Sequence, residues 1–578
     1  MSNENKQTEL PISDPKVQPK TVGEADKSDW SVRLKPKKTF QTLVSGAVMV
    51  TRPELEIIDT PDFQRLRRVR QLGSSCMVYP TAIHTRFDHS LGTLEMVEQM
   101  MQCIMRNEHS EQHEKEITPR QRAMARIYAL VHDITHVPFG HTIEDELGIL
   151  ARHDENEPRI MNFLGPDSPV GKIIIDWFGK EFHADLLRIY RWDDKLTTWD
   201  GSPDDIFIHD LVSNTVCADL LDYLRRDDHY CNLGVGMSYP FLNYLYLGAE
   251  NHAVKSLETG KETTITPRRV FVRLWKTQKG QPRRDVLSDL CRLLEARYLV
   301  AERVYFHHAK VIAGAMLARA IQEAAEAKQI DEKKMWEHSD DTLVYELMKL
   351  EKKAPLAAKL ARAYWDRRLH KCAFEYRDED IEKTQADDHR EAWMNAHVRP
   401  RLGTAQQRRA FENHLADVLM VEPGDVLIYF PDERMNMKQA QMRVLWKGQQ
   451  IPFKDVDDPV TKPRLKAVLD AHERLWSIRV LVSPSLSPEK RSLLKDLCDL
   501  ELMTGTAEAV QLRQAAYEKI VWQHLDHDKD GSAIPPAEAH KKVQAAAAVL
   551  CQAAKDTRES FGDRVRAVIS EQFGIKGK

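Results

Sequence analysis

The residues best suited to chemistry in this sequence lie in one short apolar stretch, ALVHDITHVPFGH, at positions 129–141. His132 and Asp133 are adjacent, so on a helix their side chains point about 100° apart and can hold one ion from two sides. His136 follows one turn after His132, on the same face of that helix. Because imidazole and carboxylate groups together suit a divalent metal, we expect Mn, Fe, Mg or Zn here.

Three further residues extend this pattern beyond the helix. Pro138 and Gly140 interrupt the helical sequence, so His141 can turn back into the space that His136 faces. Two more metal ligands must come from distant segments, and His89 and Asp219 are the candidates.

A purely structural interpretation competes with the metal site, because a single histidine in apolar sequence is more often a hydrogen-bonded core residue. The number of histidines in this region favours the metal site. Eight of the 23 histidines lie between positions 84 and 153. Of these, His109 and His113 lie in the polar sequence RNEHSEQHEKE and are expected to be solvated.

Helices are the elements expected to position these side chains, because apolar residues recur at helical spacing through most of the chain. The expected helical segments are 61–73, 91–106, 119–134, 210–230 and 284–327.

The chain divides into four expected regions. Residues 1–37 form a polar, disordered tail, and 38–405 form a helical core domain whose first element, near 38–50, is a strand or hairpin. Residues 406–484 form a small α+β region, and 485–578 a helical C-terminal extension. The predicted fold class is therefore mainly α, with a helical core, a smaller α+β C-terminal region and a helical extension.

Composition narrows the class of protein. The 578 residues are 42% apolar and 30% charged, with a net charge of −4, which argues against a chain built mainly to coat nucleic acid. The eight cysteines include no C-x-x-C pair and are expected to be free thiols. There is no signal-peptide core and no apolar run of the roughly 18 residues that a membrane span needs, so the sequence predicts a cytoplasmic protein with no membrane partner.

Two weaker patterns, one resembling a calcium-binding loop and one rich in basic residues, also have purely structural interpretations. Residues 526–538 carry aspartates at calcium-loop spacing, but Ala537 replaces the expected final carboxylate, so a polar interhelical loop is favoured. The basic segments 267–276 and 282–284 fit an anionic effector site and a surface hairpin about equally well.

The order H … HD … D resembles the HD-domain phosphohydrolases. The strongest likeness runs through the segments IIDTPDFQRLRRVRQLG, HTRFDHSLG, HDITHVPFGH and DYLRRDDHY. Within that superfamily, the chain looks closest to the deoxynucleoside triphosphate triphosphohydrolase (dNTPase) branch, without the SAM domain that the human enzyme carries. The resemblance makes 38–405 an HD phosphohydrolase domain.

The resemblance implies a role for each matching residue. The implied metal ligands are His89, His132, Asp133 and Asp219. The implied catalytic residues are His136, Glu144, His153 and His141, with the residue at the His153 position as general acid and Glu144 orienting His136. The implied substrate-binding residues are Gln71, Leu72, Arg86, Tyr223, Asp227, Arg297 and Tyr305.

Two positions depart from the family pattern. Thr135 stands where the family has a glycine, in the segment between the metal pair and His136. Leu220 replaces a lysine that follows the last metal aspartate, which removes one phosphate contact.

The function implied is hydrolysis of a dNTP to deoxynucleoside and tripolyphosphate, with a nucleotide effector and a homo-oligomer expected from the same resemblance. An antiviral use through dNTP depletion extends this hypothesis. Two alternatives stay open: hydrolysis of another nucleotide (a monophosphate, an alarmone or an oligonucleotide) and a nucleotide-sensing subunit with little turnover. Cleavage of cyclic dinucleotides is disfavoured because no G-Y-P follows the HD segment, and nucleic-acid binding is left open.

Overall fold

The computed structural model describes most of the chain, and helices make up 59% of it, which confirms the mainly α fold class. The described residues are 29–108, 117–194, 198–255, 262–276, 280–377, 388–431, 437–503, 517–522, 541–547 and, beyond these, 549, 567–568 and 571. The calcium-like segment 526–538 therefore lies outside the described residues.

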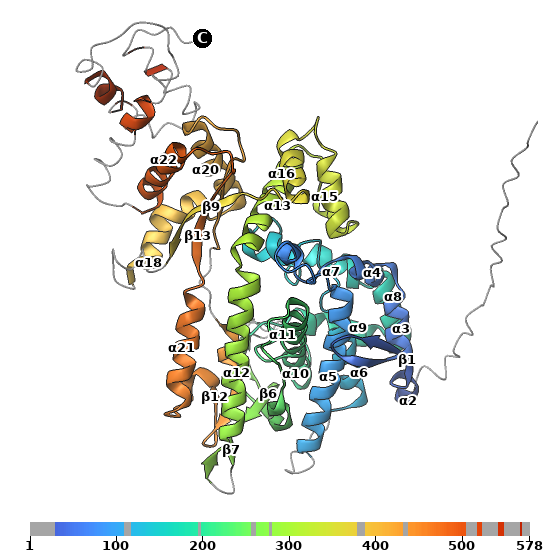
Figure 1. Ribbon diagram of the computed structural model, residues 1–578. Coiled ribbons are helices and arrows are strands. Elements are labelled where there is room, and N and C mark those ends of the chain that lie inside the picture. Colours follow the sequence, from blue (N-terminus) through green and yellow to red (C-terminus); the bar gives the residue numbers. More distant parts are fainter. Residues whose placement is uncertain are drawn as a thin grey trace, which may run out of the picture.

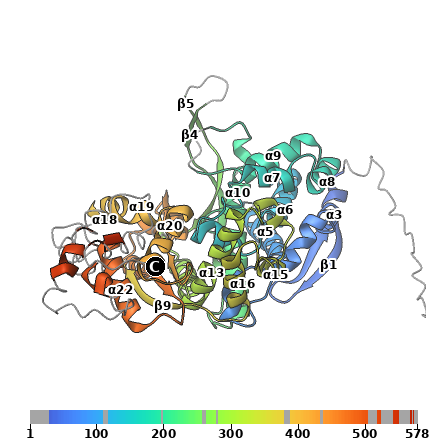
Figure 2. The same cartoon turned by 90° about the horizontal axis from the view of Figure 1, so that it is seen from above.

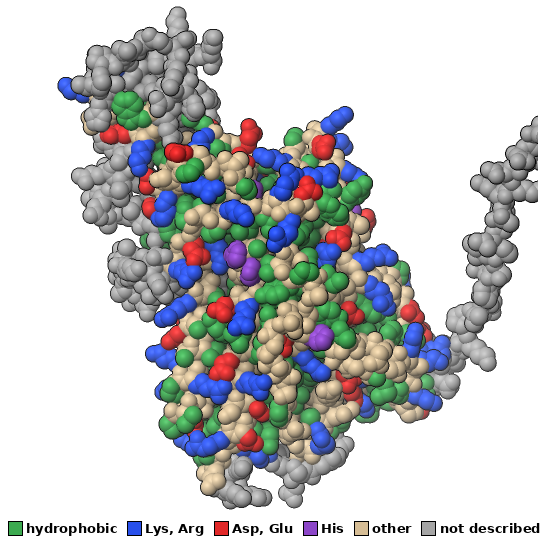
Figure 3. All heavy atoms as spheres, in the orientation of Figure 1, with side chains coloured by type: hydrophobic (Ala, Val, Ile, Leu, Met, Phe, Trp, Pro, Cys, Tyr) green, Lys and Arg blue, Asp and Glu red, His purple; other side chains and the backbone are tan. Residues whose placement is uncertain are grey.

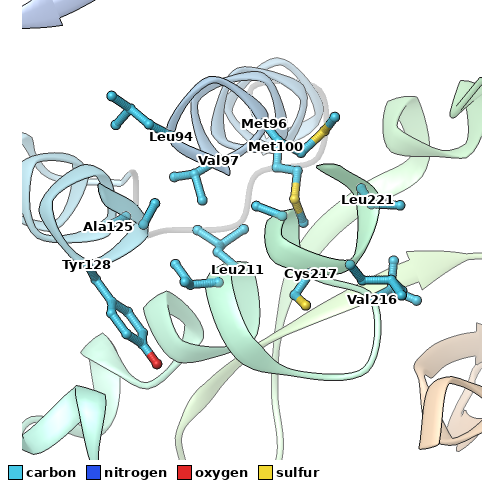
Figure 4. Packing of buried hydrophobic residues seen from close by; sticks show 14 of the residues in the cluster. Leu94, Met96, Val97, Met100, Ala125, Tyr128, Leu211, Val216, Cys217 and Leu221 are labelled. Atoms are coloured by element: carbon cyan, nitrogen blue, oxygen red, sulfur yellow. The ribbon is translucent and has the colours of Figure 1, made fainter. Parts of the chain in front are cut away.

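The centre of the molecule is a group of helices that bury the longest apolar stretches (Figure 1). They are α3 (Arg52–Ile58), α5 (Arg86–Glu108), α6 (Pro119–Val131), α10 (Phe207–Ser213), α11 (Ala218–Cys231) and α12 (Arg284–Val300). Figure 4 shows how side chains of α5, α6 and α10 meet those of the segment that leads into α11. This burial fixes the helices that carry the metal-ligand positions.

Helix α6 begins at a strong sequence signal. Thr118 accepts from the backbone N–H of Gln121, the Gln121 side chain returns the bond, and Pro119 occupies the first turn. The helix ends at Val131, immediately before His132 and Asp133, so the metal pair lies where backbone and side chains are free to turn inward.

Further helices surround this centre. On the N-terminal side they are α2 (Trp30–Arg33), α4 (Pro61–Gln64), η1 (Arg65–Arg68), η2 (Gly73–Met77), η3 (Thr142–Glu146), α7 (Glu157–Leu164), α8 (Pro169–Phe178), α9 (Lys180–Tyr190), η4 (Pro203–Asp205) and η5 (Pro240–Tyr244). A second group is η7 (Ala301–Tyr305), α13 (His308–Glu326), α14 (Glu332–Trp336), α15 (Asp340–Met348) and α16 (Pro355–Trp365). Helices α13, α15 and α16 share a separate apolar core with Val137, Phe139 and Ile143.

The strands form small sheets. The hairpin expected near 38–50 is confirmed as β1 (Pro36–Thr42) and β2 (Gly46–Thr51). A four-stranded sheet has the order β12 (Gln449–Pro452), β11 (Arg443–Trp446), β6 (Arg268–Arg273) and β3 (Leu245–Ala249). A three-stranded sheet has the order β10 (Val426–Tyr429), β13 (Ser477–Val482) and β9 (Lys371–Arg377). Two-stranded pairs join β4 (His252–Lys255) to β5 (Glu262–Ile265) and β7 (Trp275–Lys276) to β8 (Gln281–Pro282).

The stretch expected as one α+β region, 406–484, contributes to two sheets. Its strand β13 pairs with β10 on one side and with β9 on the other, whereas β11 pairs in parallel with β6 of the core domain. The β4–β5 pair extends away from the rest of the molecule (Figure 2).

A C-terminal lobe packs around the three-stranded sheet. Its helices are α18 (Asp388–Trp393), η8 (Met394–Val398), α19 (Arg399–Leu402), α20 (Ala405–Val418), α22 (Pro488–Cys498) and η11 (Asp499–Met503). Helix α21 (Thr461–Glu473) instead packs on α12. In the chain it follows η9 (Lys438–Gln441) and η10 (Phe453–Asp455) and precedes β13.

Several predicted helices are confirmed and others are wrong in detail. Helices 91–106 and 119–134 correspond to α5 and α6. The helix expected over 61–73 stops being α-helical at Gln64, because Val69 is extended and Gln71 leaves the helix to bond with the backbone of His84. The helix expected over 210–230 is interrupted between Ser213 and Ala218, where residue Asn214 is extended.

No helix of the described residues is long and apolar enough to cross a membrane. On the face in Figure 3, basic and acidic side chains are interspersed without a broad field of one sign. The cysteines of the described residues are all free thiols.

Candidate active site

The four metal-ligand positions predicted from the sequence meet at one point of the helical centre. His89 lies in the first turn of α5, His132 and Asp133 directly follow α6, and Asp219 lies in the first turn of α11. His89 Nε2 is 2.9 Å from Asp219 Oδ1 and 3.2 Å from His132 Nε2. Asp133 approaches from the other side, with Oδ2 3.7 Å from His89 Nε2.

Both imidazoles are oriented so that Nε2 faces this point. His132 Nδ1 is 2.8 Å from the Ala129 carbonyl, and His89 Nδ1 is 2.8 Å from Asp222 Oδ2. Because a carbonyl or carboxylate oxygen only accepts, each Nδ1 carries the hydrogen, which leaves a lone pair on Nε2. Lone pairs and carboxylate oxygens that converge on one point repel one another without a cation, so this donor set fits a divalent metal.

Asp222 is a residue that sequence reasoning missed. Arg226 holds its carboxylate through Nε at 2.8 Å, and Gly92 of α5 lies so close that an added Cβ would be 1.9 Å from Asp222 Oδ1. Its position one helical turn after Asp219 was the available signal. A carboxylate behind a metal-binding imidazole fixes the ring and strengthens it as a ligand.

The electrostatics of the cluster favour a cation at this point. Burial opposes ionisation of Asp133, but the Arg86 guanidinium on Asp133 Oδ2 holds the pKa of that carboxyl well below its usual range. Burial also disfavours a charged His89, yet hydrogen bonds with Asp219 and Asp222 raise the pKa of His89 to about 10. In the absence of a metal, the carboxylates therefore draw a proton onto the imidazole.

A second group of side chains lies beside the first. His136 Nε2 is 3.2 Å from Asp133 Oδ1, and its ring stacks on His153 with centroids 3.6 Å apart. Glu144 lies beneath both rings, with Oε2 3.5 Å from His136 Nδ1 and 3.4 Å from His153 Nδ1. His141 packs edge-on against His136 at 4.9 Å between centroids. All four residues predicted to be catalytic are thus brought together.

The two stacked histidines have pKa values that are shifted in opposite directions. Burial, Arg86 and His153 lower the pKa of His136 to about 4. Burial also opposes a charged His153, but Glu144 outweighs it and raises the pKa of His153. Neighbouring groups whose pKa values are pushed apart in this way are suited to acid–base chemistry.

Glu144 is held by an arginine that the sequence reasoning did not single out. Arg159, at the start of α7, forms a buried ion pair with Glu144 Oε1, and its other nitrogens bond to Glu332 and to the Ala151 carbonyl. A fully buried arginine needs an ionic partner. The ion pair with Arg159 therefore fixes the position of the Glu144 carboxylate beside the two rings. The sequence around it, NEPRIM, gave no sign of this contact.

A cavity of about 1110 Å³ opens over both groups. Its lining includes Asp133, His141, His153 and Asp219. It also includes the predicted substrate residues Gln71, Leu72, Tyr223, Asp227, Arg297 and Tyr305. This second set, which we call the nucleoside end, contains an arginine whose Nε and Nη1 are buried and find no hydrogen-bond partner among the described residues.

Arg86 is the predicted substrate residue that does not line the cavity. It is 1% exposed and directs Nη1 at Asp133 from behind. Of the two family departures, Leu220 is buried in the core, and Thr135 places its hydroxyl 3.3 Å from the Tyr190 hydroxyl.

The basic segment 267–276 is partly structural. Arg269 is 1% exposed and pairs with Asp210 and Asp194, and its neighbour Arg268 lies over the Phe207 ring. These contacts tie β6 to α10 and take at least one arginine out of a surface charge cluster.

Comparison with known proteins agrees with this geometry. Residues 291–505 match the family described as "HD associated region". The chain is 32% identical over 212 residues to the deoxynucleoside triphosphate triphosphohydrolase SAMHD1 homolog of Dictyostelium discoideum, covering 35% of this chain and 38% of that protein. It is 30% identical over 233 residues to the human SAMHD1, covering 37% and 36%, and 28% identical over 308 residues to an uncharacterised protein of Methanocaldococcus jannaschii, covering 53% and 54%. The matches thus span between about a third and a half of these relatives.

Two solved structures share the fold. A hypothetical protein from Aquifex aeolicus superposes with a TM-score of 0.53 at 19% identity, covering 79% of this chain and 99% of its own. A phosphohydrolase from Bacteroides thetaiotaomicron gives 0.50 at 18% identity, covering 77% and 100%.

A helical core in which a distant histidine and a distant aspartate complete an adjacent His–Asp pair defines the HD class of protein. The chain is similar to the HD-domain phosphohydrolases, and its curated relatives include proteins named SAMHD1 or SAMHD1 homolog.

Proposed function

We propose that this chain is a metal-dependent dNTP triphosphohydrolase that converts a dNTP to deoxynucleoside and tripolyphosphate. The observation that carries the proposal is the convergence of His89, His132, Asp133 and Asp219 on one point of a cavity whose adjacent wall holds His153 against Glu144. The similarity to deoxynucleoside triphosphate triphosphohydrolases supports the choice of substrate.

The chemistry divides between the metal and the protein. A divalent ion held by the four ligands would activate water and neutralise charge on the phosphate. His153, whose pKa is raised by Glu144, would donate a proton to the 5′ oxygen of the departing deoxynucleoside. His136, whose pKa is lowered by burial and by Arg86, would remain a neutral ring with Nε2 facing Asp133. Arg159 holds Glu144 beside both rings through an ion pair with Oε1.

The nucleoside end would bind the rest of the substrate. Arg297 lies over the Tyr305 ring, 5.0 Å from guanidinium carbon to centroid, with two nitrogens lacking a partner among the described residues. A buried guanidinium without a carboxylate is suited to a phosphate oxygen. Gln71 and Leu72 form the adjacent wall and would contact the deoxyribose.

A second candidate is hydrolysis of a nucleotide with fewer phosphates. Carboxylates outnumber lysine and arginine side chains along the cavity wall, and Leu220 stands where the family has a lysine. Both features disfavour a long anionic phosphate chain unless extra cations accompany it. A nucleotide effector, homo-oligomer formation and antiviral dNTP depletion belong to the first proposal as its regulatory and biological side. A nucleotide-sensing subunit with little turnover is a separate alternative.

The test is to incubate the purified chain with dNMP, dNDP, dNTP and NTP, singly and in mixtures, with Mn²⁺ or Mg²⁺, and to separate the products. Mixtures are needed because an effector nucleotide would act only there. We expect tripolyphosphate and deoxynucleoside in equal amounts from a dNTP. Orthophosphate released from a monophosphate would favour the second candidate, and binding without turnover would favour the sensor.

Two variants test whether the metal cluster performs the reaction. Asp219→Asn should lose both bound metal, measured by elemental analysis, and all turnover. Asp455→Asn changes an exposed carboxylate in η10, away from the cavity, and should retain both. Full turnover by Asp219→Asn would overturn the assignment of the site.

A further inference from the structure

His84 lies beneath the nucleoside end and contacts two of its lining residues. Its side chain is buried, and Nε2 is 2.9 Å from Asp227 Oδ1. Its backbone carbonyl accepts the N–H of Gln71 at 3.0 Å. The imidazole stacks on Tyr230 with centroids 4.4 Å apart, so the ring cannot rotate freely. His84 is not among the residues that line the cavity.

The contact to Asp227 continues into the cavity. The second carboxylate oxygen of Asp227 accepts the Tyr305 hydroxyl at 2.5 Å. The Tyr305 ring in turn lies under the Arg297 guanidinium. A continuous chain of contacts therefore runs from buried His84 through Asp227 and Tyr305 to Arg297, which lines the cavity.

The imidazole has a single polar partner within the described residues. Because an ionised carboxylate only accepts, His84 Nε2 must donate to Asp227, which leaves Nδ1 as an acceptor. Nδ1 is buried and has no hydrogen-bond partner among the described residues. A histidine chosen only for packing would be a costly choice at this position, since an apolar residue would leave no orphaned nitrogen.

Asp227 also limits what the nucleoside end can bind. A carboxylate repels phosphate, so its partner in a bound nucleotide must be a hydrogen-bond donor. Gln71 contributes a second acceptor, since its Oε1 is buried and lacks a partner among the described residues. The sugar of a deoxynucleotide offers one donor, the 3′ hydroxyl.

We propose that His84 is a positioning residue that holds Asp227, Tyr305 and the Gln71 backbone in place to receive the 3′ hydroxyl of a deoxynucleotide. The inference rests on the proposed function and extends it, because it assigns the recognition of that hydroxyl to a residue that never touches the substrate. His84→Leu removes the donor at similar bulk. His84→Gln keeps an amide N–H at about the reach of Nε2 and is the matched control.

The experiment compares both variants with the wild-type chain on the dNTP it hydrolyses fastest and on the 3′-deoxy analogue of that dNTP. Removing a charge-assisted hydrogen bond predicts that His84→Leu lowers kcat/KM for the dNTP about 10-fold or more, mostly through KM. His84→Gln should recover most of this loss. On the 3′-deoxy analogue, His84→Leu and the wild type should differ little, because the hydroxyl that Asp227 receives is absent.

Metal content and thermal unfolding separate positioning from a purely structural role. Both variants should retain wild-type metal occupancy. Equal losses in His84→Leu and His84→Gln on both substrates would show a structural role and overturn the proposal, as would unchanged kcat/KM in His84→Leu. If the wild-type chain neither binds nor hydrolyses any nucleotide, the proposed function itself has failed and this inference falls with it. If the wild type is active and His84→Leu equals it, only the inference has failed.

Discussion

The two carboxylates of the metal cluster differ in what else they hold. Asp133 is buried and compensates the buried charge of Arg86. Asp219 has a 31% exposed side chain and contacts His89 and His132. Removing one partner of a buried ion pair typically lowers the free energy of unfolding by about 3–5 kcal/mol. A partly exposed carboxylate contributes far less to that free energy.

We therefore expect Asp133→Ala and Asp219→Asn to lose metal and turnover alike but to differ in stability. In urea unfolding of the metal-free proteins, Asp133→Ala should lose about 3 kcal/mol or more, and Asp219→Asn less than about 1 kcal/mol. If the two variants unfold at the same urea concentration, Arg86 does not depend on Asp133 for its charge compensation.

What the sequence could predict at this scale follows from locality. His132, Asp133 and His136 lie within five positions of one another, and their types and spacing alone indicated a metal. The spacing of Asp222 from Asp219 placed it on the same face of a helix, but only the fold shows that it contacts His89. Arg159 behind Glu144 had no such signal, because sequence spacing says nothing about contacts between distant segments before the fold is known.

Among the elements, α15 links the two walls of the cavity. Asp340, its first residue, is 1% exposed and accepts the backbone N–H of Arg70 at 2.8 Å and of Phe139 at 3.1 Å. Arg70 directly precedes Gln71 in the chain. Phe139, which directly precedes Gly140, has a left-handed backbone conformation with φ of 58°. An added Cβ on Gly140 would lie 2.5 Å from His136 Nδ1, so this turn must be held closely.

Asp340→Asn should lower kcat with the metal retained, because an amide can accept one of these N–H groups but cannot accept both. A loss of about 10-fold corresponds to one lost buried hydrogen bond. Asp341→Asn is the matched control, since Asp341 is exposed and pairs only with the Arg70 side chain among the described residues. Equal turnover of the two variants would remove Asp340 from the positioning of the cavity walls.

The same residue predicts a pH dependence of stability. Burial raises the pKa of Asp340 to about 6 against the opposing backbone N–H of Arg70, from an ordinary value of 3.8. Between these values the folded state binds a proton that the unfolded state does not, so stability falls as pH rises through the window. Asp340→Asn lacks this proton. The melting temperature of the wild type relative to the variant should rise from pH 7 to pH 5, and a constant difference would contradict the assignment.

The segment whose structure was predicted least well, 61–73, is the one that brings Gln71 and Leu72 to the cavity wall. Apolar spacing over 61–73 indicated a helix, but Val69 is extended and the chain pairs with His84 and Thr85. The local preference for helix is outweighed by two long-range backbone bonds, which turn Gln71 toward the cavity. By contrast, α6 begins as predicted, because its capping box is a local signal, although it ends at Val131, three residues before the predicted end.

At the scale of the whole molecule, the C-terminal lobe reaches the catalytic segment. Arg408 of α20 donates to the Leu147 carbonyl, just beyond η3, which carries Glu144. The same helix holds α13 through a buried ion pair between Glu412 and Arg319, and Glu412 also accepts the N–H of Ile428 at 2.7 Å. The change of composition after position 405 indicated a separate region, but no sequence pattern indicated that it contacts the site.

Through this contact, we expect the lobe to help position the segment that carries Glu144. Arg408→Met keeps much of the buried volume but leaves the Leu147 carbonyl without its donor, which costs about 1–3 kcal/mol if the segment stays in place. The segment can avoid that cost by moving toward water, and Glu144 would then shift beneath His136 and His153. We expect kcat to fall about 10-fold with metal occupancy unchanged. We also expect amide hydrogen exchange to rise over residues 142–147.

Arg409→Met provides the control for lost charge on the same helix, because Arg409 is half-buried and pairs with Glu323, away from Leu147. It should leave kcat and exchange over 142–147 unchanged. If both arginine variants lose activity equally, the lobe acts through general stability of α20 rather than through Leu147. If neither does, Glu144 is held by Arg159 alone, and the lobe must serve some purpose other than positioning the catalytic segment.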